Sequence, residues 1–401
     1  MISKKIFAFL TVSAILAVVG CSINFNEHYD KVDSNKVRPI SYWITTDTAF
    51  SLSPFSSSSP ETAPGDTAAL LVFIPAGDRK ITFDEIKWRV CWNIYTDEYG
   101  NLAPRGGAVE LEVIQGGVTD YIMGGQIAIV QFKIPDDILH KSDAIPNDLS
   151  GFSKIYSIGD MENMPKTKAE ALGYLERLAN DRFLQYNIPY DIGIKIDGLA
   201  QIFSCMYEIY MDIPGVPRTK IRHAARYHKK LRYISNLYGY RSPVCTNGNP
   251  YLTSLDFYQG GWYVGDGLIG DTIEISLDKD IRSTITLGIL YAGEVADRFY
   301  SLERAFSLNP SPMDRVNETY GLRIFYSDSI YGKIELKNGA FINLGAFGAD
   351  NTYTEEIIIH RDKLKEGDTG WIWIMVYDEC YGVANFPQGR DMEGFPVKFV
   401  K

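Results

Sequence analysis

Hydrophobic and polar residues alternate along much of this chain with the period of two that is typical of β-strands. In residues 87–94 the even positions are Trp, Val, Trp and Ile, whereas the odd positions are Lys, Arg, Cys and Asn. This alternation predicts a strand with one buried face. Shorter apolar segments, separated by turn-forming residues, occur at 70–74, 108–114 and 126–134. Several short strands with turns between them predict an antiparallel β-sandwich, which we place at residues 38–160.

The same pattern returns in the last third of the chain. Predicted strands lie at 272–277, 283–291, 321–326, 332–336, 355–360, 370–377 and 395–400. The Gly270-Asp271 turn that leads into an alternating strand, and the strand 371–377 that ends in Asp378 and Glu379, resemble two strands of bacterial immunoglobulin-like modules. The resemblance implies an immunoglobulin-like sandwich at residues 246–401. It also implies a role in adhesion, spacing or ligand binding, and it transfers no catalytic residue to this chain.

Residues 161–245 have a different pattern. After Pro165, apolar residues at steps of three and four predict a helix. These residues are Leu172, Leu175, Ala179, Phe183 and Tyr186. Asp197-Gly198 is a favoured two-residue hairpin turn. The predicted fold class is therefore mainly β, with two antiparallel β-sandwich domains and a short helical and basic connecting region.

A basic segment at residues 218–241 contains eight Lys or Arg residues and no acidic residue. Its apolar residues allow an amphipathic helix. Three interpretations stay open: the segment complements the protein's own acidic surface, contacts anionic envelope polymers or lipid headgroups, or docks a partner. The candidate residues for an anionic-partner contact are Arg222, Arg226, Lys229 and Lys230.

The first residues predict a cleaved leader. Lys4 and Lys5 precede an apolar segment at 6–19, and Gly20 and Cys21 follow it. This order is typical of a secretory signal, and the apolar segment is shorter than the roughly 20 residues that span a bilayer. Residues 18–21 resemble the lipobox of bacterial lipoproteins. The resemblance implies removal of residues 1–20, acylation of Cys21, a tether at 21–37 and a lipid anchor in the outer membrane.

Composition excludes some classes of function. The 401 residues are 45% hydrophobic and 22% charged, which is sufficient for ordinary hydrophobic cores. Without the leader the net charge is −12, from 38 basic and 50 acidic residues, and this argues against a nucleic-acid partner. The cysteines outside the leader are widely spaced and form no CxxC motif, so we expect buried thiols or at most one long-range disulfide. These are Cys91, Cys205, Cys245 and Cys380.

Motifs for catalysis or cofactors are weak. Residues 265–270 match GxGxxG, but the next residues predict a strand, whereas a dinucleotide site needs a helix there. His223 and His228 lie among basic residues whose charge opposes a bound cation. No serine-nucleophile elbow, phosphate-binding loop or EF-hand loop occurs. The sequence therefore predicts no catalytic residue, no cofactor and no metal, and acidic pairs are interpreted as turn residues.

Aromatic residues offer the best candidate for a ligand site. The tryptophans of 88–92 and 371–373 lie on apolar faces of predicted strands and are expected in the core. Tyr258, Trp262 and Tyr263 flank a Gly-Gly pair, where large rings have little reason to be buried. They form the candidate ligand platform, with a structural role as the alternative.

The leading hypothesis is a non-catalytic surface lipoprotein with a binding or adhesion role, for which a glycan, a nutrient or an envelope protein is the candidate partner. Two alternatives stay open. One is a secreted carbohydrate-active enzyme whose acids converge only in three dimensions. The other is a structural subunit of a surface assembly such as a fimbria.

Overall fold

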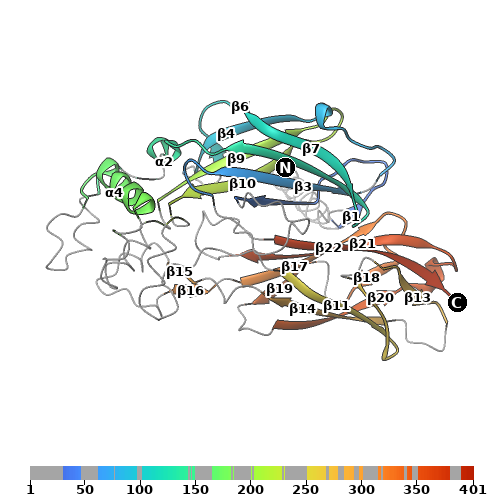
Figure 1. Ribbon diagram of the computed structural model, residues 1–401. Helices are drawn as coiled ribbons and strands as arrows, with labels where there is room; N and C mark the ends of the chain where they lie inside the picture. The colour runs from blue at the N-terminus through green and yellow to red at the C-terminus, as the bar shows by residue number, and fades with distance from the viewer. Residues whose placement is uncertain are drawn as a thin grey trace, which may run out of the picture.

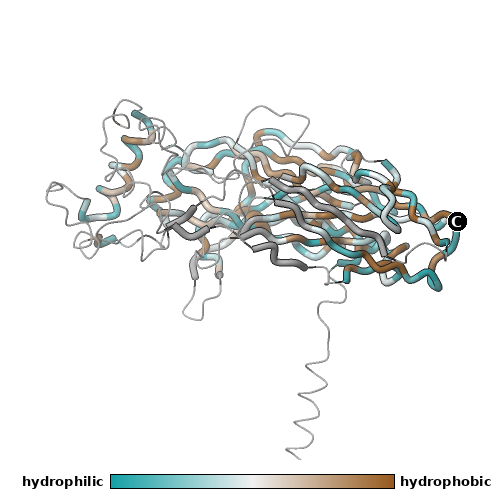
Figure 2. Tube along the Cα trace, turned by 90° about the horizontal axis from the view of Figure 1, so that it is seen from below, coloured by the Kyte–Doolittle hydropathy of each residue, from teal (hydrophilic) through white to brown (hydrophobic). Residues whose placement is uncertain are grey.

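A computed structural model gives the fold. It describes residues 30–46, 62–75, 77–96, 102–142, 145, 147–149, 165–181, 184, 200, 203–227, 230, 251–267, 271–278, 284–292, 298–300, 315–317, 319–337, 341–345, 351–379 and 390–401. These residues form a mainly β structure of stacked sheets, as the sequence predicts (Figure 1). Hydrophobic and hydrophilic residues alternate along the strands (Figure 2). The predicted leader and Cys21 lie outside the described residues.

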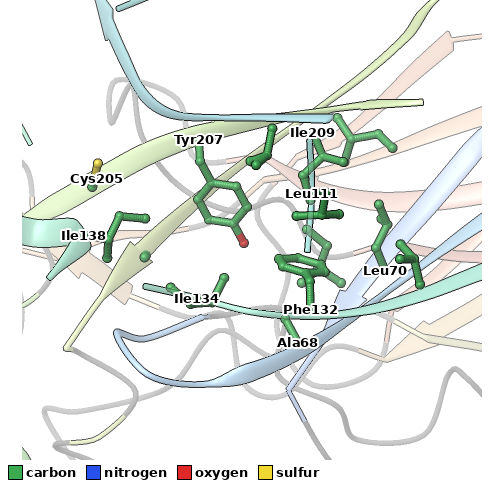
Figure 3. Close-up of a cluster of buried hydrophobic side chains, with 14 of the residues drawn as sticks. Ala68, Leu70, Leu111, Phe132, Ile134, Ile138, Cys205, Tyr207 and Ile209 are labelled. Carbon is green, nitrogen blue, oxygen red and sulfur yellow. The ribbon is translucent and has the colours of Figure 1, made fainter. Parts of the chain in front are cut away.

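The first sandwich consists of two sheets. One sheet contains, in spatial order, β2 (Ser41–Thr45), β3 (Thr67–Pro75), β8 (Gly125–Lys133) and β7 (Val113–Tyr121). The other contains β10 (Thr219–Arg226), β9 (Ser204–Asp212), β4 (Lys87–Thr96) and β5 (Leu102–Pro104), and β6 (Val109–Glu110) also pairs with β4. Side chains from both sheets fill the space between them, among them Leu70, Phe132 and Ile209 (Figure 3). The strand predicted at residues 87–94 is thus confirmed as β4, with Trp88 and Val90 in the first core. The predicted alternation does not continue to Ile94, because the ladder with β9 shifts register after Cys91 and Ile94 packs with Cys91 and Tyr210 in a separate cluster.

The β9–β10 hairpin corrects the predicted connector at 161–245. Strand β9 pairs antiparallel with β4, and Tyr207 and Ile221 are fully buried in the first core. The hairpin therefore belongs to the first sandwich. Residues 219–226 form a strand where the sequence allowed a helix, because Ile221, His223 and Ala225 alternate into the core. The predicted turn at residues 197–198 lies outside the described residues.

Helices are few in the described chain. The predicted helix is confirmed as α4 (Lys168–Asn180), where Leu172 and Leu175 are buried. The Thr167 hydroxyl accepts a hydrogen bond from the backbone N–H of Glu170, and this cap satisfies a donor at the start of the helix. Shorter helices are α2 (Ile138–Lys141), η1 (Phe83–Glu85) and η5 (Arg361–Lys363). None of the helices that the structure describes is long and apolar enough to span a bilayer.

The second sandwich also has two sheets. One contains, in spatial order, β1 (Lys31–Val32), β17 (Thr319–Ser327), β21 (Thr369–Glu379), β22 (Arg390–Val400) and β13 (Ile273–Ser276), and β19 (Phe341–Gly345) also pairs with β17. The other contains β12 (Trp262–Asp266), β11 (Tyr251–Gln259), β14 (Thr284–Ala292), β20 (Asn351–Ile359) and β18 (Ile334–Leu336). A separate pair consists of β15 (Arg298–Tyr300) and β16 (Arg315–Asn317). Strand β13 follows residues 265–270 and confirms that this GxGxxG match does not open a helix.

Part of the predicted tether is structured. Strand β1 pairs parallel with β17, nearly 300 residues away along the chain, and Val32 is buried. Beyond the strand, the Ser34 hydroxyl donates to Asp328 over 3.0 Å. The chain from residue 30 is therefore part of the second sandwich, and it leads directly from there into β2 of the first.

A third hydrophobic cluster, here called the interdomain core, joins the two sandwiches. Along β21, Ile372 and Ile374 face the core of the second sandwich, while Trp373 and Met375 face the first sandwich. Along β3, Phe73 faces the interdomain core. The four sheets therefore stack as layers (Figure 1). Strands buried on both faces read as continuous apolar segments, which explains the sequences of 70–74 and 371–377.

Candidate functional site

The hairpin of β11 and β12 exposes large aromatic side chains. Trp262 is 80% exposed, Tyr263 56% and Tyr258 37%, whereas Trp373 is 1% exposed. The Gly260-Gly261 turn has positive φ at both residues (61° and 89°), which is the conformation of the tightest hairpins and one that glycine adopts without strain. The turn thus holds the rings at the end of the strands, and the predicted exposure of this platform is confirmed.

The three rings do not form one flat surface. Tyr258 lies directly opposite Tyr263 in the ladder, and Gln259 lies opposite Trp262. Because neighbouring residues of a strand point to opposite faces, Trp262 lies on the other face of the hairpin from the two tyrosines. The tyrosine rings are 5.7 Å apart and inclined at 67°. They form an open corner on the outer face of the sheet.

Gln259 fixes the hairpin to the opposite sheet. Its side chain is buried, donates to the carbonyl oxygen of Ser276 over 2.7 Å and accepts from the backbone N–H of Ser276 over 2.8 Å. Ser276 is the last residue of β13, so the two hydrogen bonds close the end of the sandwich. The exposed rings are therefore carried by a backbone that is held on its inner side.

Two aspartates lie beside the tyrosine pair. Asp256 is two residues before Tyr258 on β11, so it shares the outer face, and it lies directly opposite Asp266 of β12. Desolvation raises the pKa of the Tyr263 hydroxyl, and the negative charges of Asp266 and Asp256 raise it further. The tyrosine corner therefore lies in a negative electrostatic field.

A second group of acids is buried in the same sandwich. Asp391 is 2% exposed, and its carboxylate accepts from the backbone N–H groups of Leu252 (2.6 Å) and Met392 (2.8 Å). Burial raises the pKa of Asp391 to about 7, against the effect of these two donors. Burial raises the pKa of Glu393 to about 8, and the charges of Asp391 and Asp266 add to the shift. Raised pKa values suit general acids, but a substrate has no access to a carboxyl as buried as that of Asp391.

The basic residues predicted to contact an anionic partner are not brought together on an open surface. Arg226 is fully buried, and a buried guanidinium is not available to a partner. Arg222 donates through Nε to the buried Glu208 over 2.6 Å. Lys230 donates to the carbonyl oxygen of Pro64 over 2.6 Å and lies 3.5 Å from Asp66. Arg226 is therefore not available to an anionic partner, whereas the ion pairs of Arg222 and Lys230 favour the interpretation in which the segment complements the protein's own acidic residues. Lys229 lies outside the described residues.

The cysteines within the described chain are buried thiols, as expected. Cys91 and Cys205 lie on the neighbouring strands β4 and β9, and neither forms a disulfide. Cys245 and Cys380 lie outside the described residues. Among the residues that the structure describes, no three His, Cys, Asp or Glu side chains converge as metal ligands do.

Sequence reasoning missed the four acids of the second sandwich. Asp391 and Glu393 lie at every second position of β22 in line with the core residues Phe395 and Phe399, so all four point to the same face of the strand. This spacing could have predicted that the two acids face the core. The opposition of Asp256 and Asp266 depends on a register shift between Phe257 and Tyr258. A two-residue Gly-Gly turn without that shift would place Gly265 opposite Asp256, so the turn alone could not have predicted the aspartate pair.

The chain matches no known protein-family model, and none of the curated proteins compared with it is significantly similar.

Proposed function

We propose that this protein is a non-catalytic binding protein of the bacterial envelope, anchored in the outer membrane through acylated Cys21. Its contact surface is the β11–β12 hairpin. The exposed aromatic residues of that hairpin carry the proposal. Solvent-exposed large rings contribute much of the binding energy in protein interfaces and ligand sites.

The surroundings of the hairpin support a binding role. Trp262 is exposed by 80%, although Trp43, Trp88 and Trp373 are each at most 5% exposed. The rest of the second sandwich is held to the first by the interdomain core. The backbone of such a supported hairpin loses little conformational entropy when a partner covers its rings. This arrangement favours recognition at the surface over chemistry in the interior, where the acids with raised pKa lie.

The binding surface is tested with an array of labelled probes. The purified full chain is applied to printed xylan, mannan, mucin and fibrinogen, which represent neutral glycans, glycoproteins and host proteins. The Tyr258→Ala/Trp262→Ala variant is compared with Val109→Ala/Ile122→Ala, a matched control that removes exposed apolar side chains at 54% and 79% exposure elsewhere.

We expect at least one probe to bind the wild-type chain and the control equally, and to bind the hairpin variant at least fivefold more weakly, roughly the effect of losing one interface anchor. Equal binding by all three proteins would remove the hairpin from the function. The anchor is tested separately, by labelling bacteria with an alkyne fatty acid. Labelled wild-type protein and unlabelled Cys21→Ser protein are expected, and label on both would contradict acylation at this cysteine.

A further inference from the structure

We propose that the outer face of β11 and β12 binds a basic segment of a partner protein and holds a Lys or Arg side chain between the tyrosine corner and two aspartates. The residues of this basic-segment site are Tyr258, Tyr263, Asp256 and Asp266. The inference rests on the proposed function, because it assigns a ligand chemistry to the same hairpin.

The geometry of the rings suits a cationic group. Tyr258 and Tyr263 are 5.7 Å apart and inclined at 67°, so a group placed in the corner meets one ring face and the edge region of the other. A cation within about 6 Å of a ring centroid is attracted by the negative face of the ring. A planar sugar face is matched best by rings that lie in one plane. The rings of this hairpin do not lie in one plane, because the two tyrosine rings are inclined and Trp262 lies on the other face of the hairpin.

The charges beside the rings have the complementary sign. Asp256 and Asp266 oppose each other directly, and like charges in that position destabilise an antiparallel pair. Their negative charges raise the pKa of Tyr263, and the charge of Asp266 also raises the pKa of Glu393. A bound ammonium or guanidinium group has the charge that complements the two carboxylates, whereas a neutral sugar has not.

The extent of the face favours a peptide over a small amine. The ladder continues from Tyr258 to Thr286 of β14 and then to Glu356 of β20, and from Asp256 through Gly288 to Thr354. Strand β14 has no charged residue (TITLGILYA), and Glu356 is paired with Lys337 over 2.6 Å. Four strands at a spacing of about 4.8 Å extend over roughly 14 Å, which is the length of four or five residues of an extended chain.

The test measures the affinity of fluorescein-labelled octalysine for the purified full chain by fluorescence anisotropy at low salt. We expect Asp256→Asn/Asp266→Asn to weaken binding about tenfold and Tyr258→Ala/Tyr263→Ala about fivefold, in the range of losing an interface charge pair or anchor. The matched control is Glu274→Gln/Glu366→Gln. This control also removes two negative charges, from exposed acids that pair with Lys398 and Lys401. It is expected to change the affinity for octalysine less than twofold.

Three outcomes would overturn this inference. The first is that octalysine does not bind, and the second is that the aspartate variant and its matched control lose the same affinity for octalysine. The third is that tetramethylammonium at equal concentration displaces octalysine, because a small amine would then be a sufficient ligand. Tighter, hairpin-dependent binding of xylohexaose would replace the basic segment with a neutral glycan. The two proposals fail separately: array binding that needs the hairpin, together with no binding of octalysine, removes only this inference.

Discussion

The indole N–H of Trp373 donates to the backbone carbonyl of Met123 over 2.8 Å, across the boundary between the two sandwiches. Both residues are 1% exposed. Trp373 also lies 6.5 Å from the ring of Phe73, which belongs to the first sandwich. The two sandwiches are therefore joined by a packed and hydrogen-bonded contact, and we expect them to unfold together.

Replacing Trp373 tests this coupling. Trp373→Ala removes a large buried ring and leaves the Met123 carbonyl without its donor, so we expect a loss of about 3–5 kcal/mol in the free energy of unfolding. Urea unfolding followed by circular dichroism measures the loss. Trp262→Ala, at an exposed ring, is expected to change stability by less than about 0.5 kcal/mol. A loss below about 1 kcal/mol for Trp373→Ala would contradict a shared core.

Two glycine-to-alanine substitutions are expected to change the stability of the protein in opposite directions. Gly124 has a φ of 70°, and a Cβ there would lie 2.5 Å from the Trp371 ring, so Gly124→Ala should destabilise the protein by at least about 1 kcal/mol. Gly173 lies inside α4 with open space around its Cα, so Gly173→Ala should stabilise the protein by about 0.5–1 kcal/mol. Thermal unfolding of both variants checks the pair, and a shift of the same sign in both would contradict the account.

The buried acids predict a pH dependence of stability. Asp391 and Glu393 have pKa values of about 7 and 8 in the folded chain, and near 4 when unfolded. The folded state therefore binds protons more strongly, and the stability that these groups contribute is present below pH 4 and is lost as the pH rises to about 8. Urea midpoints measured across that range should fall less steeply with pH for Glu393→Gln than for the wild-type chain. Parallel pH profiles for the two proteins would show that Glu393 does not titrate in this way.

The Arg222–Glu208 pair offers a further test. Glu208 is 2% exposed, and Arg222 lies 2.6 Å from its carboxylate. Arg222→Ala leaves a buried carboxylate without this partner, and we expect a loss of about 1–3 kcal/mol. Denaturant unfolding of Arg222→Ala, Glu208→Gln and the double variant measures the coupling. Strictly additive losses would mean that the pair does not interact.

Local pattern predicted many of the strands but not which strands pair, and it missed β1 and β10. The alternation of residues 87–94 predicted β4, and the three- and four-residue spacing after Pro165 predicted α4. The pairing of β9 with β4 joins residues more than 100 positions apart, and the pairing of β1 with β17 joins residues nearly 300 positions apart. Such contacts depend on how buried faces fit each other, and the period of a single strand carries no information about its neighbour.

The candidate site could be predicted only in part, again because the pairing of its strands is not evident from the sequence. A Gly-Gly turn flanked by rings indicated exposure, and the structure confirms it for Tyr258, Trp262 and Tyr263. The tyrosine corner and the opposed aspartates needed the register of the hairpin. For the basic segment, the sequence left open whether its charges meet the protein's own acids or a partner, because the partners of the strand β10 are not evident from the sequence. Arg226 is buried in the sandwich, and Arg222 pairs with an acid 14 residues earlier on β9.

The central claim is that the β11–β12 hairpin is the contact surface of an anchored binding protein. The most direct measurement compares Tyr258→Ala/Trp262→Ala with the Val109→Ala/Ile122→Ala control for binding to the array of xylan, mannan, mucin and fibrinogen. The account predicts that the control binds as the wild-type chain does and that the hairpin variant loses at least about fivefold in affinity while keeping the same unfolding midpoint. Undiminished binding by a folded hairpin variant would contradict it.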